Sequence, residues 1–181
     1  MRFMYVEYIY PIQHYFRIIK RNEAFFDLVL PIIIAVLGFY ILSSHEGVIS
    51  NTDIKELLKT IITLLAILIG FTISSIATLA TTSEKLNQET KRKIGDKSIN
   101  LYQLSNIFFI FALFSEIITL IINLSALMLI SYNVKLLTDN LNSIVLINIL
   151  LISHILFLTV RNITNFYFIH FTLHSDKSGK D

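Results

Sequence analysis

The sequence predicts an all-α membrane protein that crosses a bilayer four times, and three observations lead to this prediction. The 181 residues are 54% hydrophobic and only 15% charged, with a mean hydropathy of +0.67, whereas about a quarter of the residues in soluble domains are charged. Four apolar stretches reach about the 20 residues that a helix needs to cross the hydrocarbon core. Because these stretches lack strand-like alternation, only helices satisfy their backbone polar groups in lipid.

The predicted elements form one membrane domain, residues 1–181. It begins with residues 1–24, whose tyrosines and basic residues suit an amphipathic helix lying in the headgroup plane, either as a plain anchor or as a lipid sensor. This segment lacks an uninterrupted apolar core, so we expect no removable signal peptide. A basic loop, residues 81–100, joins the second and third spans, and a tail, residues 161–181, follows the fourth. The four spans are residues 25–42, 57–80, 104–130 and 144–160, and the apolar run of the fourth could continue toward Phe171.

The positions of Lys and Arg predict the orientation, because basic residues are retained on the cytoplasmic side of a membrane. The side predicted to hold both ends and the central loop has twelve of the 15 basic residues: Arg2, Arg17, Lys20, Arg21, Lys85, Lys91, Arg92, Lys93, Lys97, Arg161, Lys177 and Lys180. The other side keeps Lys55, Lys59 and Lys135. We therefore expect a multi-pass protein of the bacterial inner membrane with both termini in the cytoplasm.

Small side chains recur at every fourth position of the second span. They let another helix backbone approach closely, which is how helices associate in lipid. The sequence leaves open whether the partner helix belongs to the same chain or to another subunit, and we favour a contact between subunits. The stripe could instead line a water-filled pathway. The residues are Ala66, Gly70, Ser74 and Thr78.

The third span holds Glu116 near its middle. A carboxylate there costs about 2.5 to 3.5 kcal/mol on insertion scales, so it should face protein or water. Thr119 and Asn123 continue the same polar face at helical spacing. A ring of such faces in an oligomer would line a cation-favouring pore. The alternative is a carboxyl that hydrogen-bonds a neighbouring helix and holds the fold together.

The fourth span carries Asn148 and His154 within its apolar run. Spans three and four are expected to be antiparallel neighbours, and the rise per residue then places His154 and Glu116 at a similar depth, which makes them plausible partners. A satisfied polar pair is favoured over a pH-sensitive latch. We expect the Arg161 side chain to extend to the membrane–water interface. If the fourth span sits deeper in the membrane than predicted, Arg161 would instead compete with His154 for Glu116.

Several classes of function are not indicated. The chain has no cysteine, and its five glycines form no phosphate-binding loop. It also lacks a nucleophile elbow and an HExxH pair, so we expect neither an enzyme nor a bound cofactor. His170 and His174 are four residues apart, but without a third ligand nearby we expect no metal site. A net charge of +2 gives no reason to expect direct nucleic-acid binding.

The aromatic tail and the basic loop offer a cytoplasmic face on which a soluble protein could dock, although retention of basic residues alone would also explain the loop. The candidate docking residues are Lys85, Lys91, Arg92, Lys93, Lys97 and Arg161.

Three features besides the four-span layout can be matched to a known family: the packing stripe around Gly70, Glu116 in a long third span, and the loop KLNQETKRK that begins at Lys85. In these features and its cytoplasmic ends the chain resembles the membrane subunit of the Kiwa antiphage system. The resemblance implies a homo-oligomeric platform that senses envelope damage and signals to a soluble DNA-binding partner. The alternatives are a pore that depolarises the membrane and, less favoured, an intramembrane enzyme or proton-coupled transporter using Glu116 and His154.

Overall fold

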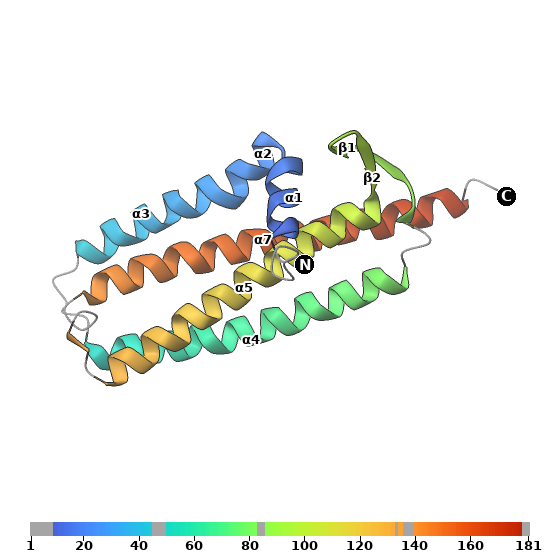
Figure 1. The fold of residues 1–181 in the computed structure, drawn as a ribbon. Coiled ribbons are helices and arrows are strands. Elements are labelled where there is room, and N and C mark those ends of the chain that lie inside the picture. Colours follow the sequence, from blue (N-terminus) through green and yellow to red (C-terminus); the bar gives the residue numbers. More distant parts are fainter. Residues whose placement is uncertain (1–8, 45–49, 83–85, 133, 136–139, 179–181) are drawn as a thin grey trace, which may run out of the picture.

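Four long helices lie side by side in the computed structural model (Figure 1). The structure describes residues 9–44, 50–82, 86–132, 134–135 and 140–178. Within this part of the chain, 4 helices are long and apolar enough to cross a membrane: Arg21–Ile41, Asn51–Thr81, Leu101–Ser131 and Leu141–Phe168. The all-α, multi-pass fold predicted from the sequence is confirmed.

The first span is a continuous helix built from three segments. It begins with α2 (Arg21–Ala24), widens into a π-helical turn, η2 (Phe25–Val29), and continues as α3 (Leu30–Ser43). Pro31 stands within this helix and leaves it unbroken. The π-helical turn is the irregular part of the span, and such turns are frequent at functional sites.

The second and third spans begin earlier than predicted because capping residues stand in front of them. At the start of α4 (Asn51–Thr81), the Ser50 hydroxyl accepts a hydrogen bond from the Asp53 amide at 3.2 Å, and the Ser50 amide donates to the Asp53 carboxylate at 3.0 Å. Asn100 caps α5 (Leu101–Ser131) in the same way. These reciprocal bonds satisfy amides that a helix start otherwise leaves unpaired.

The fourth span belongs to a longer helix than predicted. Helix α7 (Leu141–Ser178) is unbroken and includes most of the predicted tail, because the sequence contains neither Gly nor Pro between these bounds, and both residues interrupt helices. Figure 1 shows that α7 continues past the other long helices at the end of the bundle where the hairpin lies.

The long helices are ordered α4, α5, α7, α3, each packing on the next. At one end of the bundle Ile130 of α5 packs with Ile144 of α7, and at the other Phe108 packs with Leu158. Helices α5 and α7 are therefore antiparallel neighbours, as predicted. The antiparallel arrangement also places the start of the first span beside residues 157–165 of α7.

Helix α1 (Tyr10–Ile18) crosses the long helices (Figure 1). Its Tyr15 and Ile18 are buried against α5, where the Tyr15 ring stacks on Phe111 with centroids 3.5 Å apart. The described part of the predicted interfacial segment is thus helical, with one face on the bundle.

The described part of the basic loop contains a β-hairpin, which the sequence analysis did not predict. Strands β1 (Glu89–Ile94) and β2 (Lys97–Asn100) pair antiparallel, and Ile94 faces Lys97 across the turn. The turn residue Gly95 has φ 62, a conformation that glycine adopts without strain and that two-residue hairpin turns require. Ile99 is buried and holds the hairpin against the bundle.

Candidate functional site

A buried ionic cluster lies where α1, η2 and α7 meet. The Asp27 side chain of η2 is 0% exposed and pairs with Arg161 of α7. The Tyr15 hydroxyl of α1 donates a hydrogen bond of 2.6 Å to the same carboxylate. One acidic residue therefore joins the N-terminal helix, the first span and the fourth span.

The π-helical turn contributes its backbone to this cluster. His154 Nδ1 donates a hydrogen bond to the main-chain carbonyl of Asp27. A π-helical turn departs from the regular helical bonding pattern, and here a side chain from α7 binds a carbonyl within it. Asp27 is thus held to α7 through both its side chain and its main chain.

Aromatic rings surround the arginine of this cluster. The guanidinium carbon of Arg161 lies 4.2 Å from the centroid of the Phe108 ring and 5.3 Å from that of the Tyr15 ring, distances at which a cation is attracted to the face of a ring. Burial raises the pKa of Tyr15 to about 12, although the charge of Arg161 acts in the opposite direction. The phenol therefore stays a neutral hydrogen-bond donor at physiological pH.

A second ion pair fixes the hairpin to the start of the first span. Arg92 of β1 pairs with Glu23 of α2 and donates a hydrogen bond of 3.0 Å to the carbonyl of Ile18. Its guanidinium carbon lies 5.3 Å from the centroid of the Phe108 ring, the ring that Arg161 also contacts. The two arginines therefore meet at one aromatic side chain.

These contacts divide the predicted docking residues into two groups. Arg92 and Arg161 form internal ion pairs, with side chains 16% and 13% exposed, so their assignment to partner docking is corrected. Arg161 neither extends to solvent nor competes for Glu116. The residues that remain exposed are Lys91, Lys93 and Lys97. Lys85 lies outside the described residues.

Glu116 occupies a separate polar site between α4 and α5. Its side chain is 0% exposed, and its Oε1 accepts a hydrogen bond of 2.9 Å from the Thr72 hydroxyl. Its Oε2 has no hydrogen-bond partner among the described residues. The expected pair of Glu116 with His154 is therefore wrong: the carboxyl faces α4, whereas the imidazole faces η2. Similar depth did not make them partners because they point to different neighbouring helices.

The other predicted intramembrane polar residues face the inside of the same chain. Thr119, Asn123 and Asn148 are 2%, 1% and 4% exposed. The two asparagine amides each donate to a carbonyl four residues earlier in their own helix, at 2.9 Å. Because this stripe is buried within one chain, it does not form a free face that several subunits could share around a pore.

The small-residue stripe of α4 faces outward instead. Ala66, Gly70, Ser74 and Thr78 are all exposed, and a Cβ added at Gly70 would meet nothing within 4 Å. No other helix of the same chain therefore packs against the stripe at Gly70. The predicted contact with a second subunit stays a prediction.

Asp27 is the central residue of the ionic cluster, and the sequence analysis did not identify it. It lies inside a stretch that was treated as uniformly apolar, residues 25–42. The signal was present: an acidic residue in the first turns of the first span, and Arg161 at the matching end of the fourth. Charges inside predicted spans are expected to pair with one another.

Comparison of the chain with protein-family models, curated proteins and solved structures finds no match. The described residues contain no group of three or more His, Asp or Glu side chains that could hold a metal ion. The functional argument therefore depends on the geometry of this chain.

Proposed function

We propose that this chain is a non-enzymatic subunit of the bacterial inner membrane that holds a soluble cytoplasmic protein at the membrane. The length of α7 is the observation that carries the proposal. Its 38 residues extend roughly 57 Å at about 1.5 Å per residue, nearly twice the hydrocarbon thickness of about 30 Å. The excess lies at the end of the bundle that also carries the hairpin, so a helix and a folded basic element project from the same end (Figure 1).

The charges at this end support a cytoplasmic orientation and a docking role. Lys91, Lys93 and Lys97 are exposed on the hairpin, while Arg92 between them is turned inward to Glu23. The inward ion pair fixes the hairpin, so Lys91 and Lys93, which flank Arg92 on β1, are held on its outward face. Lys97 is exposed beside the turn, opposite Ile94, and adds to the basic surface of the hairpin. Such a surface attracts an acidic region of a partner and speeds encounter.

Antiphage defence is the biological setting that we propose for the platform. The four-span layout and the basic element between the second and third spans agree with the resemblance to the Kiwa membrane subunit. In that setting, several chains would associate through the outward stripe of α4, and the assembly would pass a signal of envelope damage to its soluble partner.

Affinity purification in mild detergent from the native host tests the docking role. We expect a soluble protein to co-purify in stoichiometric amount with the wild-type chain, and to be lost when Lys91, Lys93 and Lys97 are all replaced by Gln. The matched control replaces Lys55 and Lys59, at the opposite end of the bundle, and should keep the partner. Equal recovery of the partner from the triple variant and the control would contradict docking at the hairpin.

A further inference from the structure

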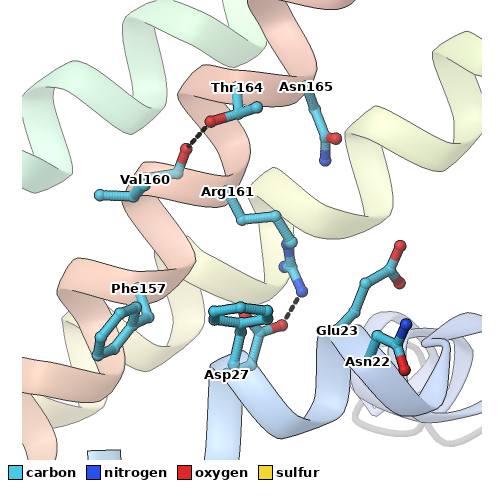
Figure 2. Close-up of a pocket in the computed structure, with 9 residues that line it drawn as sticks. Asn22, Glu23, Asp27, Phe157, Val160, Arg161, Thr164 and Asn165 are labelled. Atoms are coloured by element: carbon cyan, nitrogen blue, oxygen red, sulfur yellow. Dashed lines mark hydrogen bonds and ion pairs between the residues drawn. The ribbon is translucent and has the colours of Figure 1, made fainter. Parts of the chain in front are cut away.

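A cleft of about 430 Å³ opens between the start of the first span and residues 157–165 of α7, a part of the helix that still packs within the bundle (Figure 2). One wall comes from α2 and η2, and the other from α7. The ion pair between Asp27 and Arg161 closes its inner side. Phe26 and Val160, which are 55% and 59% exposed, lie on its two walls.

Both walls change from apolar to polar in the same direction. On α7, Phe157, Arg161 and Asn165 follow at four-residue steps and so lie on one face of the helix. On the opposite wall, Phe26 lies about one helical turn from Asn22. The polar end of the cleft is the end nearest α1 and the hairpin. This order matches the change from acyl chains to headgroups at the edge of a bilayer.

The polar end offers hydrogen-bonding groups of both kinds. The amides of Asn22 and Asn165 come from different walls, and the Glu23 carboxylate lies between them in the view of Figure 2. In the part of the chain that the structure describes, Arg161 Nε and Nη2 and Asp27 Oδ1 have no hydrogen-bond partner. The two carboxylates are balanced by Arg92 and Arg161, so the cleft has no net charge that would favour a purely anionic ligand.

We propose that this cleft binds one membrane phospholipid with a zwitterionic phosphoethanolamine headgroup. The phosphate accepts hydrogen bonds from the amides of Asn22 and Asn165, with Arg161 as the adjacent positive charge. The ammonium donates to the carboxylate of Glu23. One acyl chain lies along Phe26, Phe157 and Val160, between the first and fourth spans. This assignment does not depend on the proposed platform function.

Native mass spectrometry of the delipidated chain in mild detergent tests the site, with phosphatidylethanolamine and phosphatidylglycerol of identical acyl chains as probes. We expect one phosphatidylethanolamine per chain to bind, and phosphatidylglycerol to bind more weakly. Val160→Trp fills the cleft from α7 and should abolish this binding. The matched control is Leu156→Trp, because Leu156 is exposed on the same helix but does not line the cleft.

A second variant addresses the headgroup without filling the cleft. Asn165→Leu removes a donor to the phosphate and should lower the affinity for phosphatidylethanolamine by about tenfold, the effect of losing a hydrogen bond to a charged group. Equal lipid binding by Val160→Trp and Leu156→Trp would overturn the site. Equal affinity for the two lipids would overturn the headgroup assignment. A dimer or a bound peptide that occupies the cleft and blocks lipid addition would overturn the assignment of a lipid to this site.

Discussion

Asp27 is stable inside a membrane span because several groups bind it at once. Arg161 supplies the opposite charge and Tyr15 a hydrogen bond of 2.6 Å, while the carbonyl of the same residue accepts from His154. A buried ion pair adds little net stability over apolar residues of the same volume, but removal of one partner leaves the other charge without compensation. The cluster therefore specifies which helices are neighbours more than it adds stability.

Replacement of Asp27 by Asn should destabilise the chain by about 3–5 kcal/mol, because the guanidinium of Arg161 stays buried without its counter-charge. The measurement is thermal unfolding of the purified protein in detergent. The double variant Asp27→Leu, Arg161→Met carries neither charge and should regain most of the lost stability. If Asp27→Asn unfolded at the same temperature as the wild type, the ion pair would not hold the first span to the fourth.

The raised pKa of Tyr15 predicts a loss of stability at alkaline pH. The phenol titrates near 10.0 when exposed and at about 12 in the folded chain, so its contribution to stability is complete below pH 10 and is lost as pH rises toward 12. Unfolding temperatures measured from pH 8 to pH 12 should therefore fall less steeply for Tyr15→Phe than for the wild type. Parallel curves would contradict the burial of this hydroxyl.

Two of the costly groups inside the spans were recognised from the sequence but were paired wrongly with each other, and a third, Asp27, was missed. Glu116 and His154 were recognised from their positions in apolar runs, and both are held by hydrogen bonds. The partner of each side chain depends on which neighbouring helix that side chain faces. Counting residues along one sequence does not reveal this direction. Depth along the membrane follows from counting residues, whereas rotation about the helix axis and the order of helices follow from packing of the whole bundle.

At the scale of elements, helix α4 has two different faces. One face is buried against α5 and supplies Thr72 to Glu116. The other carries the exposed stripe around Gly70, where added side-chain atoms meet no neighbour. In lipid, close approach of small residues is a major source of helix association, so this face is the strongest candidate for a contact between chains.

Gly70→Leu should leave the unfolding temperature of the isolated chain near that of the wild type and lower its oligomeric mass. The measurement is light scattering coupled to gel filtration in mild detergent. Gly38→Leu is the contrasting variant: a Cβ at Gly38 lies 3.1 Å from Ile149, so this change should disturb packing of α3 on α7 and lower the unfolding temperature. An oligomer unaffected by Gly70→Leu would exclude the stripe as the interface.

The sequence predicted the spans well and the elements outside them less well. Long apolar runs identify membrane helices because lipid enforces helical hydrogen bonding. The hairpin depends on Gly95 in a two-residue turn and on Ile99 packing on the bundle, and the sequence analysis interpreted that region by charge alone. The extension of α7 was assigned to a tail that begins at residue 161, although the sequence from there to Ser178 contains no Gly or Pro that would end a helix.

At the scale of the whole molecule, the proposed function requires one orientation in the membrane: the end that carries α1, the hairpin and the extension of α7 faces the cytoplasm. Charge distribution supports this orientation, since the opposite end keeps only Lys55, Lys59 and Lys135 of the basic residues. Docking of a soluble partner on the exposed lysines requires it. The ion pairs of Asp27 and Glu23 would then lie near the cytoplasmic boundary of the membrane.

Single-cysteine labelling tests this claim most directly, because the natural chain has no cysteine. Ser98 is exposed on the hairpin, and Tyr132 is 78% exposed at the opposite end of α5. A membrane-impermeant maleimide applied to intact spheroplasts should label Tyr132→Cys, and should label Ser98→Cys only after the membrane is opened. If only Ser98→Cys were labelled from outside, the proposed orientation would be wrong. If both variants were labelled from outside, α5 would not cross the membrane.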